Sequence, residues 1–137
     1  MLAFRGPRGL VRRAVMSEGA YVVQRRDGRL IIGSTVERVG FDKSLTLEGV
    51  AGILSGLRRM TTALDRCAFL EAWTGLRPYS PDGLPLIGKS SIGGLYVATG
   101  HFRHGILLAP ATAHALAELI QTGRSAVDLG PFDPTRF

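Results

Sequence analysis

The stretch that decides the fold is Tyr21–Gly33, YVVQRRDGRLIIG, in which two apolar runs flank a polar turn. Val, Ile and Tyr favour strands, and an Asp-Gly pair between two such runs is a strong local signal for a β-hairpin. The stretch therefore predicts two antiparallel strands, Tyr21–Gln24 and Leu30–Gly33, joined by a turn over residues 25–28. We expect this hairpin to lie in an antiparallel sheet.

Further short apolar runs on both sides of the hairpin add strands to this expectation. Gly and Pro clusters bound these runs and separate them from one another. The expected strands cover residues 2–5, 10–15, 68–76, 84–87 and 95–98.

Two longer segments have helical rather than alternating periodicity. Residues 46–60 place apolar side chains at helical spacing, and either Thr46 or Ser44 can cap the start. Residues 106–121 form an apolar helix that Gly123 is placed to stop. The tail, residues 128–137, is expected to be an extended surface strap. The fold class predicted is α+β, a mostly antiparallel sheet with a covering helix.

Composition limits the classes of protein that this chain can represent. Its 137 residues suffice for one domain, and 45% hydrophobic residues are typical of a folded one. The single cysteine, Cys67, excludes an internal disulfide and a cysteine-based zinc site, and it fits a cytoplasmic location. No apolar run approaches the roughly 18 residues of a membrane-spanning helix.

The net charge of +6 comes largely from arginine, because only Lys43 and Lys89 are lysines. A basic surface can bind nucleic acid, whereas a basic part of a larger protein can also be offset by acidic parts elsewhere. Aromatic residues are sparse among the arginines and no lysine tract occurs, so we expect no nucleic-acid partner.

The stretch richest in chemical groups is Val97–Leu108, VATGHFRHGILL. An expected strand enters a loop bracketed by Gly100 and Gly105, and the loop opens into a helix whose free N–H groups and positive dipole end suit an electron-rich ligand. The same sequence also fits a tight turn with solvated side chains, and the residues alone leave both interpretations open. A metal site from His101, His104 and His114 lacks an acidic ligand nearby, so we expect no metal.

Arg77 ends an apolar run just before a proline, where its guanidinium could grip a carboxylate with two hydrogen bonds. Arg77 could instead be an ordinary surface arginine that pairs with Glu71 or Asp82. The residues alone favour this second interpretation. No Gly-x-Ser-x-Gly elbow, P-loop or Gly-x-Gly-x-x-Gly motif occurs. Cys67 beside Arg66 is expected to be a packed thiol rather than a nucleophile.

Three segments taken in order resemble the C-terminal part of the glycine oxidases, within the D-amino-acid oxidase family of FAD-dependent amine oxidoreductases. They are residues 21–35, the run WTGLRP with PDGLP over residues 73–85, and GHFRHGILLAP over residues 100–110. The resemblance extends from Met1 to the end of the chain. It implies FAD as cofactor and the oxidative deamination of a small amino acid to an imine and then a 2-oxo acid, with release of peroxide, as in the glycine oxidases of thiamine biosynthesis.

The resemblance also implies roles for residues at matching positions. Arg77 would bind the substrate carboxylate, Tyr21 would reach the same carboxylate with its hydroxyl, and Arg103 would lie between flavin and substrate. The residues implied to wrap the flavin ring are His101, Phe102, Arg103, His104, Gly105, Ile106 and Leu107. The helix that follows would direct its positive end at the flavin and stabilise the anion formed on reduction.

Three positions depart from the family pattern. Gln24 replaces a proline, His104 replaces an asparagine in the flavin loop, and Val36 falls where glycine oxidases can carry a methionine near the substrate. The preferred amine is therefore open.

The resemblance further implies a division of the chain and a missing part. Residues 1–92 would belong to the substrate-binding domain, residues 93–124 would be the flavin-contacting strand, loop and helix, and residues 125–137 would be the tail. The family's dinucleotide-binding fold lies upstream of the segment that matches Met1, so nothing here holds the pyrophosphate. We expect a truncated gene product that does not turn over amines alone. Alternatives are half of a split oxidase, completed by a separate FAD-domain chain, and a non-catalytic remnant that self-associates or binds a partner.

Overall fold

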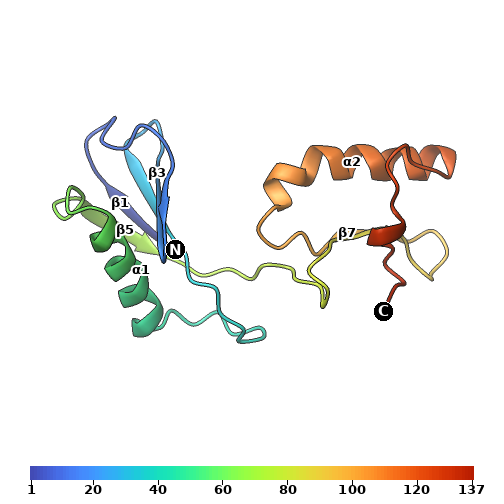
Figure 1. Ribbon diagram of the computed structural model, residues 1–137, viewed down its shortest axis with the longest axis horizontal. Helices are drawn as coiled ribbons and strands as arrows, with labels where there is room; N and C mark the ends of the chain where they lie inside the picture. Colours follow the sequence, from blue (N-terminus) through green and yellow to red (C-terminus); the bar gives the residue numbers. More distant parts are fainter. The chain divides into compact units, whose positions relative to one another are not determined.

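The structure is a computed structural model that describes residues 1–137. The chain folds as two units, Met1–Leu76 and Arg77–Phe137. Figure 1 shows the course of the chain, coloured from the N-terminus to the C-terminus. No helix is both long and apolar enough to cross a membrane.

The first unit is built on a five-stranded antiparallel sheet in the order β2-β3-β4-β1-β5. Its strands are β1 (Leu2–Arg5), β2 (Val15–Ser17), β3 (Ala20–Gln24), β4 (Arg29–Gly33) and β5 (Ala68–Ala72). The hairpin predicted from Tyr21–Gly33 is confirmed, with Val22 opposite Ile32. Gly28 closes its turn with φ of 90°, a conformation that favours glycine.

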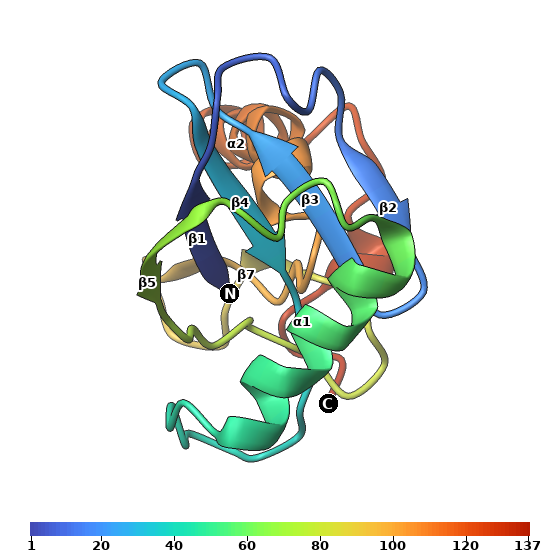
Figure 2. The same cartoon turned by 90° about the vertical axis from the view of Figure 1, so that its left-hand side faces the viewer.

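One face of this sheet carries the core. Leu2, Ile32 and Val22 lie side by side on β1, β4 and β3 and are almost completely buried. Helix α1 (Leu47–Met60) covers this face, as Figure 2 shows from the side of this unit. The helix contributes Ile53 and Leu57 to the core. Thr46 caps the helix by accepting a hydrogen bond from the Gly49 amide at 3.1 Å, as one of the two expected caps.

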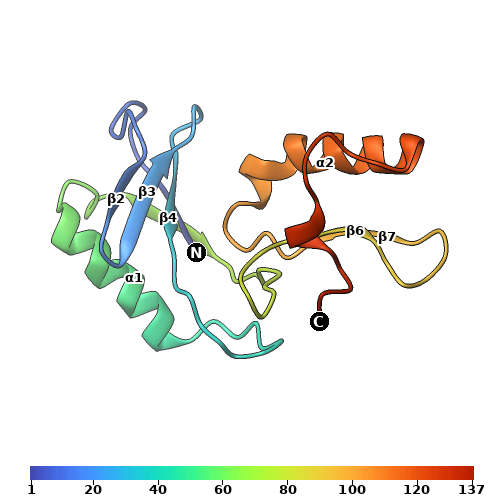
Figure 3. The same cartoon turned by 45° about the vertical axis from the view of Figure 1, so that its right-hand side comes forward.

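The second unit consists of a two-stranded antiparallel ribbon, a helix and the tail. The ribbon is β6 (Leu86–Lys89) paired with β7 (Tyr96–Thr99), and α2 (Gly105–Thr122) lies along it, as Figure 3 shows. Gly123 ends α2 in the left-handed conformation, which confirms its expected role. Only Ile87 and Ala115 are buried apolar residues here.

The expected α+β class and the covering helix are confirmed, but several strand bounds were wrong. Residues 10–14 form no strand, because the Gln24 side chain accepts a hydrogen bond from the Val11 amide at 3.0 Å and holds this segment as a loop. Strand β5 ends at Ala72 rather than residue 76, because its partner β1 begins only at Leu2. Strand β6 begins two residues late, because Leu84 belongs to a turn capped by Asp82.

The tail was expected to be extended, and this is wrong in part. Residues Gly130–Phe132 form the short 3-10 helix η1, with Pro131 near its start, where a missing N–H costs nothing. The portions 1–92, 93–124 and 125–137 stay a prediction about a larger protein. In this chain, pairing of β6 with β7 places residues 77–92 in the second unit.

Candidate functional site

The glycine-bracketed loop of the second unit, residues 100–105, joins β7 to α2 and forms the candidate site. Gly100 has φ of 80° and lets the chain turn tightly out of β7. Phe102 has φ of 51°, a left-handed conformation that bulky side chains rarely adopt. Such a strained position is held by its surroundings and is typical of binding sites.

The surroundings that hold Phe102 come from the segment that begins with Arg77. The Phe102 amide donates a hydrogen bond to the Pro78 carbonyl at 3.0 Å, and Tyr79 forms an isolated β-bridge with His101. The Tyr79 and Phe102 rings meet edge to face with centroids 5.3 Å apart. The structure thus brings the Arg77 segment and the loop together by backbone hydrogen bonds.

The other end of the loop is fixed to α2. His101 Nε2 lies 2.9 Å from Thr112 Oγ1, one N–H or O–H donating to the other atom according to the imidazole tautomer. The His104 amide donates to the His101 carbonyl at 2.9 Å, which closes the loop just before the helix. Loop, helix and Arg77 segment are therefore one connected structure.

The start of α2 presents groups suited to a flat, electron-rich ligand. His104 is the N-cap but its side chain makes no capping hydrogen bond, and the first turn contains no acidic residue. The first amides of a helix have no intrahelical partner and carry its positive dipole end. Ile106 is 96% exposed and Leu107 76% exposed, which gives an apolar surface beside these donors. Free backbone donors beside exposed apolar side chains are chemically compatible with the flavin ring that the resemblance implies.

The charged candidates lie as follows. Arg77 is half-buried, and Arg103 is exposed, with its guanidinium carbon 5.2 Å from the Phe102 ring centroid. Tyr21 belongs to the first unit, on β3, where its hydroxyl donates to Met1 Sδ at 3.5 Å. His114 Nε2 lies 3.4 Å from Glu118 Oε1, one turn further along α2.

Two positions that depart from the family pattern have a local setting in the structure. Gln24 joins two loops, because its amide nitrogen donates to the Pro7 carbonyl at 2.7 Å and to the Gly28 carbonyl at 3.2 Å. A proline could make neither bond. His104 precedes the first residue of α2 with φ of −104° and its side chain is exposed.

Cys67 is half-buried against the core of the first unit. Burial raises the pKa of its thiol, which disfavours the nucleophilic thiolate. Its geometry matches the packed thiol expected from the sequence.

Sequence reasoning missed three contributors to this unit. Tyr79 and Thr112 hold the loop, and Arg136 in the tail forms an ion pair with Asp82. Arg136 and Asp82 are 54 positions apart, and no periodicity or spacing rule joins such distant residues.

Comparison with known proteins identifies the family of this chain. The family of FAD-dependent oxidoreductases (DAO) matches residues 3–119. The chain belongs to this family.

Several relatives of this chain are glycine oxidases. The chain is 36% identical over 135 residues to the glycine oxidase of Pseudomonas aeruginosa, covering 98% of this chain and 37% of that protein. It is 40% identical over 141 residues to the bifunctional protein ThiO/ThiG of Trichormus variabilis, covering 22% of it. The crystal structure of glycine oxidase from Geobacillus kaustophilus matches with a TM-score of 0.90 at 35% identity, over 99% of this chain and 37% of that one. The chain thus spans little more than a third of the glycine oxidases that it matches.

Proposed function

We propose that this chain forms the substrate-binding and flavin-facing portion of an FAD-dependent oxidase of glycine or another small amino acid. The observation that carries the proposal is the hydrogen bond between the Phe102 amide and the Pro78 carbonyl, with its neighbouring bridge from Tyr79 to His101. It joins the segment of a carboxylate-binding candidate, Arg77, to the loop of the flavin-binding candidates. A cytoplasmic location is part of this proposal.

Arg77 would bind the carboxylate of the amino acid. A guanidinium offers two parallel N–H donors that match the two oxygens of a carboxylate, which fixes the orientation of the substrate as well as its charge. The fixed backbone of Pro78 and Tyr79 limits the motion of the arginine that precedes them. Arg103 would supply positive charge beside the reacting amine, and the substrate role of Tyr21 stays a prediction.

The residues that would hold the flavin ring are His101 to Leu107. FAD, when bound, supplies the electron acceptor for oxidation of the amine to the imine. The exposed Ile106 and Leu107 side chains would exclude water from one side of the ring. The first amides of α2 would donate to its electron-rich edge and stabilise negative charge there, as preorganised dipoles do.

The chain alone is proposed to be inactive. The glycine oxidases that it matches are nearly three times as long, since the matching region is 37% of the glycine oxidase from Pseudomonas aeruginosa. The motif that cradles a pyrophosphate at the start of a helix, Gly-x-Gly-x-x-Gly, does not occur in these residues. Catalysis would then need an upstream FAD-binding part, in the same chain or in a second one.

The test uses the purified chain with and without an FAD-binding part, which is taken from the region of the Pseudomonas aeruginosa glycine oxidase that this chain does not match. We expect no stoichiometric flavin absorbance from the chain alone. The combination should bind FAD and release peroxide from glycine, sarcosine or D-alanine. Flavin bound one-to-one by the chain alone would contradict the proposed inactivity, and a flavin-loaded combination without peroxide release would contradict the proposed reaction.

A matched pair of variants tests the role of Arg77 in that combination. Arg77→Lys keeps the charge but loses the two-donor fork, so kcat/KM should fall by about tenfold or more. Arg124→Lys makes the same chemical change at an exposed position of the same unit and should leave kcat/KM unchanged. Equal kcat/KM values for both variants would remove Arg77 from the substrate site.

A further inference from the structure

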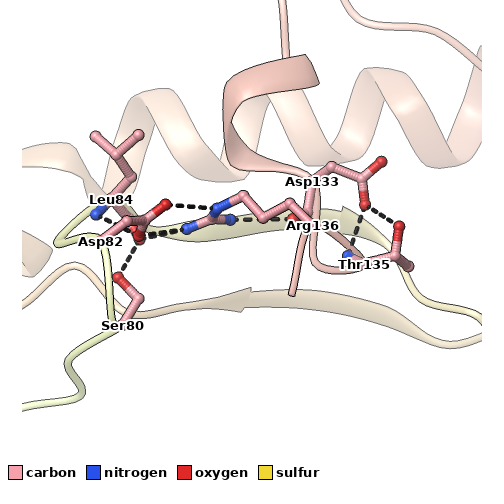
Figure 4. Close-up of polar contacts among 6 residues, drawn as sticks. All are labelled: Ser80, Asp82, Leu84, Asp133, Thr135 and Arg136. Atoms are coloured by element: carbon pink, nitrogen blue, oxygen red, sulfur yellow. Dashed lines mark hydrogen bonds and ion pairs between the residues drawn. The ribbon is translucent and has the colours of Figure 1, made fainter.

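The C-terminal tail returns to the turn that precedes β6 through one arginine. Arg136 Nε donates to Asp82 Oδ2 at 2.8 Å, and its Nη2 donates to Asp82 Oδ1 at 2.9 Å and to the Leu84 carbonyl at 2.9 Å. Figure 4 shows this fork. The Arg136 side chain is only 16% exposed, although the tail around it lies at the surface. Three hydrogen bonds from this guanidinium to a single turn make the contact geometrically specific.

The tail is ordered so that Arg136 reaches the turn. The Asp133 carboxylate accepts from the Thr135 amide and hydroxyl, both at 2.7 Å, and the Asp133 carbonyl accepts from Arg136 Nη1 at 3.0 Å. Pro134 packs on Gly88 of β6, where an added Cβ would lie 3.1 Å from the proline Cδ. The arginine therefore approaches from a tail that is already fixed against the ribbon.

The turn that Arg136 grips is itself tightly bonded. The Gly83 amide donates to the Ser80 carbonyl at 3.0 Å, and the Leu84 amide donates to Asp82 Oδ1 at 3.0 Å. The Ser80 hydroxyl, on a residue only 2% exposed, donates to the Leu84 carbonyl, the same acceptor that Arg136 uses. Arg136 therefore bonds to two groups of the turn at residues 80–84, the Asp82 carboxylate and the Leu84 carbonyl.

The turn continues directly into the contacts that hold the glycine-bracketed loop. Tyr79 precedes Ser80 and bridges His101, and Pro78 accepts from the strained Phe102. A movement of the turn would displace these two residues, because only one or two peptide units separate them from Ser80. The contacts form a continuous series from Arg136 through the turn to the loop.

We propose that Arg136 is a positioning residue for the flavin-facing loop, acting through Asp82 and the turn at residues 80–84. Loss of its fork would free the turn, loosen the Tyr79–His101 bridge and release Phe102 from its left-handed conformation. The arginine itself touches none of the candidate cofactor-binding residues. This inference rests on the proposed function only for its consequence in flavin binding; the coupling of tail and loop belongs to the chain alone.

Amide hydrogen exchange of the full chain tests the coupling without any cofactor. We compare the wild type with Arg136→Gln, Arg136→Lys and the exposed control Arg124→Gln. Arg136→Gln should raise exchange over residues 78–84 and 99–104 by about tenfold while leaving the middle of α2 unchanged. Arg136→Lys, which keeps the charge without the fork, should fall between it and the wild type. The control should match the wild type.

Two results would overturn the proposal. Unchanged exchange over residues 99–104 in Arg136→Gln would show that the fork does not reach the loop. Faster exchange throughout the second unit, α2 included, would show that Arg136 merely stabilises the unit.

A flavin titration of the same variants combined with the upstream part tests the consequence. Arg136→Gln should weaken FAD binding several-fold, whereas Arg124→Gln should not. Equal FAD affinity of both variants would overturn the positioning role toward the cofactor. Failure of the wild-type combination to bind FAD would instead contradict the proposed function and leave the exchange experiment to decide the coupling.

Discussion

The two units of this chain differ in what holds them together. In the first unit a row of apolar side chains on three neighbouring strands is covered by α1, which gives a closed core. In the second unit, α2 buries only Ala115, while Ile106 and Leu107 at its start are exposed. Polar contacts such as the fork of Arg136 on Asp82 fix the second unit instead. The first unit therefore has a buried apolar core, whereas the second buries few apolar residues and exposes two of them at the start of its helix.

The largest loss of stability is expected from a substitution in the core of the first unit. Leu30 on β4 is completely buried, so Leu30→Ala removes packed methyl groups and leaves a cavity. We expect the free energy of unfolding of the first unit to fall by about 2–5 kcal/mol. Urea unfolding, monitored through the hydrogen exchange of the β1 and β4 amides, measures this loss. A change below about 1 kcal/mol would mean that this core is not closely packed.

A smaller effect is expected where α1 approaches the sheet. A Cβ on Gly56 would lie 2.8 Å from the Gly19 carbonyl oxygen, whereas one on Gly52 meets nothing within 4 Å. Gly56→Ala should therefore destabilise the first unit by about 1–3 kcal/mol. Gly52→Ala is its matched control and should stabilise by about 0.5–1 kcal/mol, because alanine favours the helix. Similar denaturation midpoints for the two variants would contradict this close approach.

The polar character of the second unit predicts a dependence of its stability on pH. The Arg136 guanidinium holds the pKa of Asp82 well below its usual range. In the unfolded chain the Asp82 carboxyl has a pKa of about 3.9. The stabilisation by the ion pair is therefore fully present above the unfolded pKa, and it is lost as the pH falls toward the lower pKa of the folded state. Asp82→Asn should reduce the loss of stability between about pH 6 and pH 3. Amide exchange of β6 and β7 measures the stability of the second unit at each pH. An equal loss of stability in the wild type and the variant would show that the ion pair of Arg136 and Asp82 adds no stability.

The smallest effect is expected at the exposed start of α2. Ile106 is 96% exposed, so Ile106→Ala should change the stability of the chain alone by no more than about 0.5 kcal/mol. Combined with the upstream part, the same variant should weaken flavin binding if Ile106 faces the ring. Thermal unfolding of the chain and flavin titration of the combination measure the two effects. A large loss of stability in the chain alone would show that Ile106 already packs within its own unit.

Local signals in the sequence predicted most of the elements. The hairpin, the Thr46 cap and the Gly123 stop depend on neighbouring residues, so they could be predicted without a structure. The strand expected at residues 10–15 failed because a distant side chain, Gln24, satisfies the Val11 amide in a loop. The apolar run after Ala72 failed as a strand because no partner strand extends beside it.

For the candidate site, the sequence by itself determined the loop and its glycines, and the resemblance it carries marked Arg77. Only the tertiary structure decided that Pro78 and Tyr79 hold Phe102 and His101, and that Arg136 reaches Asp82 from the far end of the chain. Such contacts depend on where separate elements pack rather than on the spacing of residues along one element. Periodicity therefore predicts a strand or a helix, whereas the position of a binding loop depends on hydrogen bonds between segments that the sequence keeps apart.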